Sequence, residues 1–179
     1  LYGRSDIFSP CFLRVRIRHS VFILAETDPH MPVHSETRKL PYSADQMYDL
    51  VADISAYPQF LPWCSAARIR SRSIQGECET VEADLVISFK VFREGFASRV
   101  ELWNMAQKIV NQYLEGPFKH MKSSWEFVDT PSGCDVRFFV DFEFKNAILR
   151  SIVGVVFNEA MQRIVRAFES RAEMLYGKS

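Results

Sequence analysis

The longest helical pattern in the chain spans residues 146–176, and it limits the possible folds more than any other feature of the sequence. Apolar residues recur there every three or four positions, which places them on one face of an α-helix with about 3.6 residues per turn. A long apolar face must be buried against a large apolar partner surface. The residues on this predicted face are Leu149, Ile152, Val153, Val156, Ala160, Ile164, Ala167, Phe168 and Leu175.

The two halves of the predicted helix differ in polarity. Residues 148–157 are apolar nearly all round, whereas Gln162, Arg163 and Arg166 give the second half a polar face. The first half therefore has more apolar surface than contact with one sheet would bury. Such an excess is either buried on two sides or offered to an apolar partner.

The segment 66–145 provides the partner surface, because it has the pattern of an antiparallel sheet. Apolar and polar residues alternate along it, as in strands that bury one face, and turn-forming residues separate the alternating runs. We predict strands at residues 36–40, 66–74, 77–92, 96–103, 108–114, 122–128 and 134–144.

Two short helices are predicted between the first strand and the others. Ser43 and Gln46 have the spacing of a capping box, which begins a helix that runs to about residue 52. Asp53 can cap a shorter helix that Pro58 and Pro62 end, because proline cannot continue helical hydrogen bonding. This order of elements predicts an α+β fold in which a bent antiparallel sheet of about seven strands holds a long C-terminal helix.

Composition narrows the function. The chain has 179 residues, 47% of them hydrophobic, with 22 basic and 22 acidic residues. The length and hydrophobic content are enough for one domain with a large core. The balanced charge gives no electrostatic reason to bind DNA. The longest apolar run, residues 152–157, is far shorter than the roughly 20 residues of a membrane-spanning helix. The 15 phenylalanines indicate either an aromatic core or the lining of an apolar pocket.

The cysteines Cys11, Cys64, Cys78 and Cys134 contain no CxxC pair. Their spacing relative to the four histidines is not that of a zinc site. We therefore predict reduced thiols and no metal site.

Residues 1–30 differ from the rest of the chain. They contain Arg4, Arg14, Arg16 and Arg18, and their short apolar clusters have no pairing partner. Three interpretations compete: an over-extended gene start, a disordered arm, or an Arg-rich mitochondrial import sequence. We favour the first and place the folded domain at residues 31–179.

No catalytic motif emerges from the sequence. GxSxG, HExxH and Gly-rich phosphate loops are all missing. Glu82 and Asp84 are the best acid-base pair, but Ser88 and Lys90 share their strand face, which is typical of solvated surface. We therefore predict no catalytic residues.

The alternating arginines Arg68, Arg70 and Arg72 are predicted to lie on one side of a strand. A solvated strand face is the favoured interpretation. The alternative is contact with anionic lipid headgroups or with RNA phosphates.

Several segments together resemble one protein family. They are Leu40-Pro41-Tyr42-Ser43, residues 49–53, residues 57–64 with the sequence YPQFLPWC, Gly116-Pro117-Phe118, Trp125-Glu126-Phe127 and residues 142–145. They are similar to the coenzyme Q-binding proteins of the START-like, polyketide cyclase/dehydrase group, which also includes bacterial ribosome-association toxins. The resemblance covers about residues 33–176, and the YPQFLPWC segment is its most specific part.

This resemblance implies a helix-grip fold of the START/Bet v 1 type, with an apolar tunnel between the sheet and the long helix. It also implies that the chain binds ubiquinone or another prenylquinone in support of respiration and has no catalytic cofactor. The alternative that it implies is binding to the large ribosomal subunit. The expected location is the bacterial cytoplasm with peripheral contact to the inner membrane, or else the matrix side of the mitochondrial inner membrane.

The predicted site follows from the same resemblance and from the apolar pattern. Tyr57, Trp63 and Lys145 are the candidates for contact with the quinone ring, and Ile148 and Val155 are the candidates for contact with the membrane. The full set of predicted tunnel residues is Tyr57, Phe60, Trp63, Phe89, Phe118, Trp125, Phe138, Phe142, Lys145, Ile152 and Val156.

Overall fold

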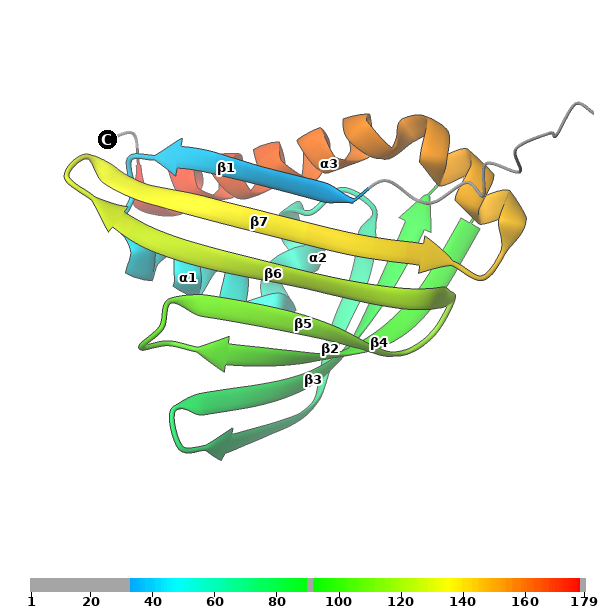
Figure 1. Ribbon diagram of the computed structural model, residues 1–179, viewed down its shortest axis with the longest axis horizontal. Coiled ribbons are helices and arrows are strands. Elements are labelled where there is room, and N and C mark those ends of the chain that lie inside the picture. The colour runs from blue at the N-terminus through cyan, green and yellow to red at the C-terminus, as the bar shows by residue number, and fades with distance from the viewer. Residues whose placement is uncertain (1–32, 90–91, 178–179) are drawn as a thin grey trace, which may run out of the picture.

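A bent, seven-stranded antiparallel sheet with one long helix across its concave face forms the fold, as seen in the computed structural model (Figure 1). The structure describes residues 33–89 and 92–177, so the predicted extension at residues 1–30 lies outside it. The strands are β1 (His34–Leu40), β2 (Cys64–Gln75), β3 (Cys78–Phe89), β4 (Phe92–Trp103), β5 (Lys108–Glu115), β6 (Phe118–Thr130) and β7 (Gly133–Phe144). The helices are α1 (Ala44–Ala52), the short 3-10 helix η1 (Ile54–Ala56), α2 (Tyr57–Phe60) and α3 (Ala147–Tyr176). The predicted α+β arrangement is confirmed.

The strand order is β1-β7-β6-β5-β4-β3-β2, so the first strand pairs with the last and β2 to β7 form a meander. Strands β1 and β2 therefore lie on opposite edges of the sheet. The chain passes from one edge to the other through α1, η1 and α2, which cover one end of the concave face.

The predicted capping box at the start of α1 is confirmed. The Gln46 N–H donates to Ser43 Oγ at 3.2 Å, and the Ser43 N–H donates to Gln46 Oε1 at 3.0 Å. The Ala44 N–H also donates to Asp129 Oδ1 at 2.8 Å, which fixes the helix start against the end of β6. These contacts satisfy backbone donors that an α-helix cannot pair internally.

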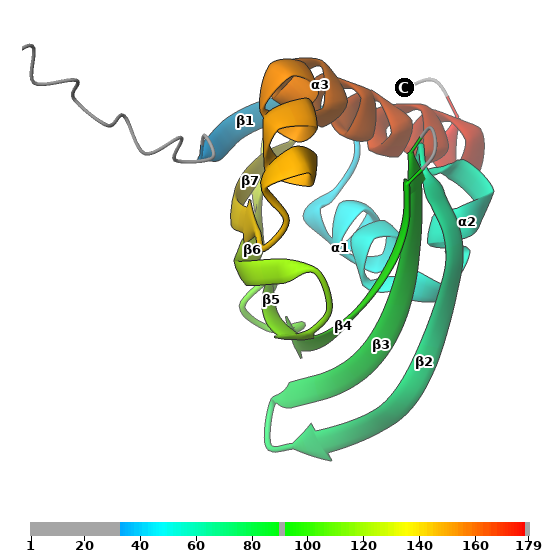
Figure 2. The ribbon, with the colours of Figure 1, turned by 90° about the vertical axis from the view of Figure 1, so that its right-hand side faces the viewer.

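The sheet is bent into a trough that α3 covers (Figure 2). One wall contains β1, β7 and β6, and the other contains β2, β3 and β4. The β2–β3 pairing shifts register between Ile69 and Ser71, and the β4–β5 pairing shifts at Ala97 and Ser98, where Leu114 of β5 is left over. Such irregularities increase local bending.

Helix α3 begins at the N-cap Asn146, whose side-chain oxygen accepts the N–H groups of Ile148 and Leu149. Its N-terminal turns bend away from the axis of the remainder (Figures 1 and 2). Leu175 was expected on the apolar face but is 50% exposed, whereas Ala172 and Tyr176 on either side of it pack on the core. The buried residues of α3 are Leu149, Phe157, Met161, Val165, Phe168 and Ala172.

The largest differences from the predicted strand boundaries lie between β3 and β4 and at the start of β6. A continuous strand at 77–92 was expected, but β3 ends at Phe89 and pairs through it with Phe92, the first residue of β4. Residues 90–91 lie outside the described part of the chain, and Lys90 and Val91 contain no turn-forming residue to mark a hairpin. Strand β6 begins at Phe118 instead of residue 122, directly after the predicted break at Gly116 and Pro117.

The β6–β7 turn depends on Gly133, whose φ is +138°. A Cβ at this position would lie 2.0 Å from the Leu40 carbonyl oxygen. We expect Gly133→Ala to lower the free energy of unfolding by about 3 kcal/mol, because it adds backbone strain to a clash with fixed backbone atoms. Chemical denaturation measures this change.

Gly76→Ala is the matched control for that experiment. Gly76 also has a positive φ, of +60°, but a Cβ added to it would have no other atom within 4 Å. This substitution should cost only about 1 kcal/mol, the cost of left-handed backbone alone. Equal costs for both variants would show that the contact with Leu40 is unimportant.

Candidate functional site

An apolar cavity of about 260 Å³ lies between the first half of α3 and the concave face of the sheet. Among the described residues that line it, only Glu94 is charged. The lining residues are Pro62, Trp63, Ile87, Phe89, Phe92, Glu94, Phe96, Pro117, Phe118, Met121, Phe138, Val140, Phe142, Phe144, Leu149, Ile152, Val153, Val156, Ala160, Met161 and Ile164.

Strand alternation explains how the sheet contributes to this lining. Successive side chains of a strand point to opposite faces, so Phe138, Val140, Phe142 and Phe144 of β7 all point into the trough. The polar residues between them, such as Asp141, point outward. The part of the concave wall that β7 forms is therefore apolar.

Helix α3 forms the roof. Leu149 and Phe157 are 5% and 2% exposed and anchor the helix to the sheet. Between them, Ile152, Val153 and Val156 line the cavity but are not fully buried. The front half of α3 thus spans the cavity instead of packing closely on the sheet.

Phe118 organises the aromatic side chains at the β5–β6 end of the cavity. Its ring centroid lies 5.3 Å from that of Phe96, 5.7 Å from Phe142 and 4.7 Å from Phe144. The Phe96 and Phe142 contacts are edge-to-face, a geometry that aromatic pairs favour. These contacts fix the rings that shape this wall.

Trp63 lines the cavity from the loop between α2 and β2 and has an unusual backbone conformation. Its φ is +65°, a left-handed value that costs a bulky residue about 1–3 kcal/mol. The Ser88 N–H donates to the Trp63 carbonyl at 2.7 Å, and the Trp63 ring meets that of Phe89 edge-on at 5.3 Å. The Arg163 guanidinium lies 6.0 Å from the ring centre. Strain held in this way by surrounding contacts is typical of ligand sites.

The cavity brings together seven of the eleven predicted tunnel residues. Their shared feature is a position on an inward-facing strand side, on the inward face of α3, or in the loop before β2. These residues are Trp63, Phe89, Phe118, Phe138, Phe142, Ile152 and Val156.

Tyr57 and Phe60 were predicted in the tunnel, but the structure places them beside the second half of α3. The Tyr57 hydroxyl donates to the Val51 carbonyl at 2.6 Å, and burial raises its pKa well above the usual range. The Phe60 and Phe168 ring centres are 5.2 Å apart. Both residues therefore belong to the core that attaches α2 to α3.

Trp125 and Lys145 also lie outside the cavity lining. Trp125 stacks on Phe138 at 4.1 Å, farther along the inward face of β6 than the cavity extends. The exposed Lys145 side chain donates to the Gly116 carbonyl at 3.1 Å. Of the three residues predicted to contact a quinone ring, only Trp63 lines the cavity.

Several lining residues that were not among the predicted tunnel residues still follow the apolar patterns of the sequence. Val140 and Phe144 alternate with Asp141 and Glu143 in the same pattern as the selected Phe138 and Phe142. Val153, Ala160 and Ile164 belong to the predicted apolar face of α3. Other lining residues, among them Glu94, Met121, Met161 and the two prolines, stand outside both patterns.

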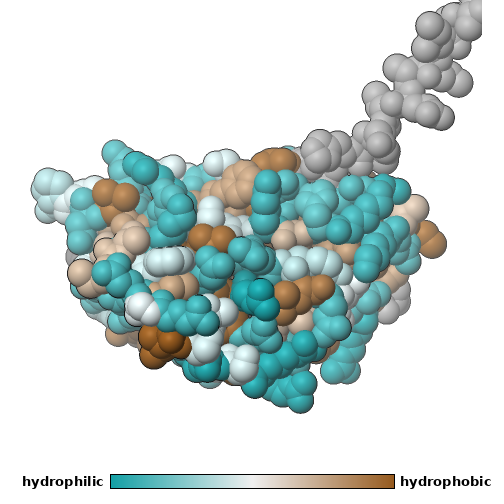
Figure 3. Space-filling model, turned by 60° about the horizontal axis from the view of Figure 1, so that its bottom comes forward, coloured by the Kyte–Doolittle hydropathy of each residue, from teal (hydrophilic) through white to brown (hydrophobic). Residues whose placement is uncertain are grey.

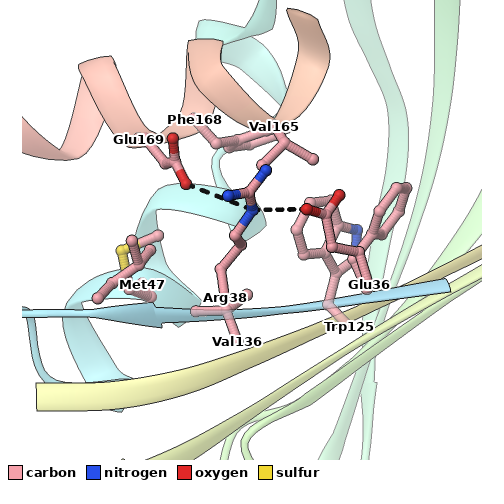
Figure 4. Close-up of a pocket in the computed structure, with 10 residues that line it drawn as sticks. Glu36, Arg38, Met47, Trp125, Val136, Val165, Phe168 and Glu169 are labelled. Carbon is pink, nitrogen blue, oxygen red and sulfur yellow. Dashed lines mark ion pairs between the residues drawn. The ribbon is translucent and has the colours of Figure 1, made fainter. Parts of the chain in front are cut away.

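A second cavity, of about 20 Å³, lies between β1 and the rear of α3 (Figure 4). Arg38 projects from β1 toward the helix, with its Nε 2.6 Å from Glu36 and 3.7 Å from Glu169. It also donates to Gln162 Oε1 at 3.0 Å. A space of this size holds about one water molecule. The charged groups therefore fasten the edge strand to α3 and do not form a ligand site.

The predicted acid-base pair lies on the convex face of the sheet, away from the cavity. Glu82 pairs with Arg99 at 2.9 Å, and Asp84 pairs with Arg68 and Arg70 at 2.7 Å each. Hydrogen bonds from Arg70 and then Arg68 hold the pKa of Asp84 below its usual range. Figure 3 shows the largely hydrophilic surface on this side of the molecule.

The predicted arginine stripe does not lie on one face. The register shift between Ile69 and Ser71 leaves Arg70 without a directly opposite residue, and Arg72 then lies opposite the inward-facing Val81. Arg72 pairs with Glu79 at 2.7 Å. All three arginines thus have acidic partners, including Glu115 for Arg70.

The structure adds three observations on metals, thiols and membranes. Residues 33–89 and 92–177 contain no group of three or more His, Cys, Asp or Glu side chains able to hold a metal ion. Cys64, Cys78 and Cys134 are buried free thiols, and Cys11 lies outside the described residues. Within the same ranges, no helix has the length and apolarity needed to cross a bilayer.

Comparison with known proteins gives a family match over most of the chain. Residues 40–169 match the family described as polyketide cyclase / dehydrase and lipid transport. The ribosome association toxin RatA of Rickettsia prowazekii is 39% identical over 140 residues, covering 76% of this chain and 93% of that protein. RatA of Escherichia coli K12 is 37% identical over 82% of this chain and 90% of its own length.

A mitochondrial coenzyme Q-binding protein homolog from Xenopus laevis is 32% identical over 81% of this chain, but the match covers only 59% of that protein. Among solved structures, an 18 kDa protein of Caulobacter crescentus has a TM-score of 0.70 and 35% identity, covering 83% of this chain and all of that one. A START superfamily protein of Mycobacterium smegmatis has a TM-score of 0.68 at 22% identity, covering 80% of this chain and 98% of its own. At that identity, the likeness shows the fold alone.

Proposed function

We propose that this chain, which belongs to the polyketide cyclase/dehydrase and lipid transport family, binds a polyisoprenoid quinone such as ubiquinone in its cavity without transforming it. The observation that carries this proposal is the cavity lining, which is apolar except for Glu94. A coenzyme Q-binding protein among the relatives supports the same class of ligand.

The energetics favour such a ligand. Moving an isoprenoid tail from water into an apolar site is favourable by roughly 0.8 kcal/mol per buried carbon, so few polar contacts are needed for affinity. The cavity volume of about 260 Å³ is close to the lower end of the roughly 300–1,000 Å³ of ligand pockets. A long-tailed quinone exceeds this volume, so part of its tail would remain outside.

The absence of catalysis is part of the proposal. The lining side chains in the described residues include no hydroxyl or thiol nucleophile and no pair of acid-base groups. The aromatase/cyclase Zhui shares the fold with a TM-score of 0.66 at 19% identity, which does not transfer its activity. No catalytic cofactor is needed for a binding protein of this kind.

Quinone recovery is the direct test. We expect gentle purification followed by organic extraction and mass spectrometry to recover a prenylquinone from the wild-type chain. Ala160→Phe places a ring in the cavity and should reduce recovery at least about tenfold, because the ring occupies the space of the ligand. Asn158→Phe adds the same ring at an exposed position of α3 and serves as the control. Recovery of no isoprenoid, with failed loading in vitro, would refute the proposal.

Entry of a bilayer-resident ligand requires contact with the membrane surface. Ile148 and Val155 are 64% and 86% exposed, and they lie about two helical turns apart on one side of the α3 roof. Lys119 and Arg150 lie beside this part of the molecule, each with its side-chain nitrogen 2.6 Å from Glu143. Exposed apolar residues on one side of a helix suit a bilayer interface. The two basic groups add little to it, because Glu143 already pairs with both. We therefore place the protein peripherally on a quinone-containing membrane, the bacterial inner membrane or the matrix side of the mitochondrial one.

Substitution of the two exposed residues tests this contact. Ile148→Lys and Val155→Lys should each weaken liposome binding and quinone loading about tenfold, because a charge replaces an apolar group at the interface. The melting temperature should stay unchanged because both side chains are exposed. Met174→Lys, at a 72% exposed residue near the other end of α3, is the control. Loading from liposomes at the original rate in both variants would place the entrance elsewhere.

Binding to the large ribosomal subunit is the second candidate function. Its support is the identity of 39% and 37% to two proteins named ribosome association toxin. The charges on the chain do not favour it, because Arg68, Arg70 and Arg72 are all paired with acidic residues. Sedimentation of a cell extract should show the protein with free large subunits if this function holds. Its presence only in the soluble and membrane fractions would exclude it.

A further inference from the structure

An open cleft of about 280 Å³, the α1 cleft, lies between α1 and the inward face of the β2–β3 hairpin. Tyr48 and Asp49 of α1 form one side, and Arg72, Ile74 and Glu79 of the hairpin form the other. In Figure 2 the hairpin projects past α1, which leaves the end of its inward face uncovered by the described helices. The β2–β3 turn lies at the opposite end of the molecule from the start of α3 (Figure 1). Among the described residues, none lines both this cleft and the apolar cavity.

Strand pairing shows that the cleft is an uncovered part of the concave face. Ile74 of β2 lies opposite Glu79 of β3, which in turn lies opposite Leu102 of β4. Arg72 lies opposite Val81. Because Leu102 and Val81 are 5% and 0% exposed, these positions belong to the inward face of the sheet. Ile74 is nevertheless 75% exposed, so the inward face is open to solvent at this end.

Tyr48 directs a polar atom into the α1 cleft from a buried position. The residue is 4% exposed, lines the cleft, and packs its ring edge-on against Phe127 with the ring centres 6.0 Å apart. Its hydroxyl forms no hydrogen bond with the part of the chain that the structure describes, and it is not among the unpaired polar atoms that are sealed from solvent. Buried polar groups in folded proteins nearly always have a partner. The hydroxyl is therefore held where a bound group can pair with it.

The charges that line the α1 cleft are mainly negative. Asp49, Glu77 and Glu79 line it together with Arg72, so two negative charges are in excess. Arg72 pairs with Glu79 at 2.7 Å, whereas the carboxylates of Asp49 and Glu77 form no ion pair or hydrogen bond with described residues. Burial first, and then the charges of Glu79 and Asp49, raise the pKa of Tyr48 to about 12. The cleft therefore favours a cationic group.

Apolar residues form the rest of the wall and its rim. Ala52, Ile74 and Leu102 line the cleft. Met105, which is 80% exposed, follows the lining residue Asn104 in the β4–β5 turn. A small cation would leave Ile74 and Met105 exposed, whereas a partner protein would cover them.

We propose that the α1 cleft binds an arginine side chain of a partner protein. Arginine combines an apolar stem with a charged, planar head that carries five N–H donors. The stem packs on Ile74 and Leu102. The guanidinium pairs with Asp49 and Glu77, and one of its N–H groups donates to the Tyr48 hydroxyl. This site is separate from the quinone cavity and gives the chain a protein partner in addition to its lipid ligand.

Titration of the isotope-labelled chain with a short peptide, followed by NMR, tests this inference. The probe is acetyl-Gly-Arg-Gly-amide, and its control is the same peptide with citrulline, which has the shape of arginine without its charge. We expect saturable shifts of the backbone signals of Gly76 and Asn104, which line the cleft. The citrulline peptide should bind at least about fivefold more weakly, because hydrogen bonds between charged groups are stronger than neutral ones.

Two conservative variants test the roles of the lining residues. Tyr48→Phe should weaken binding of the arginine peptide about three- to tenfold, the effect of one lost hydrogen bond. Its melting temperature should stay unchanged, because the ring contact with Phe127 remains and the hydroxyl pairs with no described residue. Asp49→Asn should weaken binding about two- to fivefold, the effect of one exposed ion pair.

Matched controls remove the same groups elsewhere. Tyr42→Phe removes a hydroxyl that donates to the Gly177 carbonyl, and Asp135→Asn removes a carboxylate from the outer face of β7. Neither should change the affinity for the arginine peptide. The inference fails if no signal shifts saturably, if both peptides bind equally, or if Tyr48→Phe and Asp49→Asn both keep the original affinity.

Two further measurements identify the occupant and separate this site from the proposed function. Agmatine carries the same guanidinium without a peptide backbone, and tighter binding of agmatine than of the arginine peptide would overturn the assignment to a protein partner. Tyr48→Phe and Asp49→Asn should leave recovery of prenylquinone unchanged, because neither residue lines the apolar cavity. Loss of quinone together with peptide binding would indicate a packing defect and overturn the separate site.

Discussion

The contact of Phe168 with three aromatic residues holds the molecule together. The centre of its ring lies 5.7 Å from that of Tyr57, 5.2 Å from that of Phe60 and 5.1 Å from that of Trp125. This one side chain of α3 therefore contacts both ends of α2 and the inward face of β6. Ala172, with 0% exposure, continues this packing toward the C-terminus. The rear half of α3 is thereby fixed, and the front half can extend over the sheet with fewer contacts.

This division between a packed half and a spanning half explains the cavity. Empty apolar space lowers stability, by about 24 cal/mol per Å³ in core-truncation variants of another protein, so a close-packed interior would be more stable. The chain instead places large side chains around the space, and Trp63 takes a strained backbone conformation beside it. A poorly packed, less stable region inside an otherwise closely packed protein is typical of a binding site.

The sequence predicted the architecture because its signals are periodic. The three- and four-residue spacing of α3 and the alternation of β7 are direct consequences of how each element buries a face. The boundary between β3 and β4 was misplaced, because the alternation in the sequence continues past Phe89 to residue 91. The register shift at Arg70 was missed for a similar reason, since a bulge leaves no mark in a pattern of alternating charge.

The site was harder to predict than the fold. Aromatic composition indicated that a pocket was possible but could not distinguish Phe142, which lines the cavity, from Phe60, which packs in the core. Alternation identifies the inward face of a strand but not how far along the strand the cavity extends, so Trp125 was included although it lies beyond the end.

The central claim is that the space beneath the front half of α3 receives the ligand. Methyl NMR of isotope-labelled protein during titration with a short-tailed ubiquinone tests it most directly. We expect chemical-shift changes and ligand contacts at Ile87, Val140, Ile152 and Val156, which line the cavity, and none at the core methyls of Val51 and Val81. Changes confined to surface methyls such as Ile74, or contacts spread evenly through the core, would contradict it.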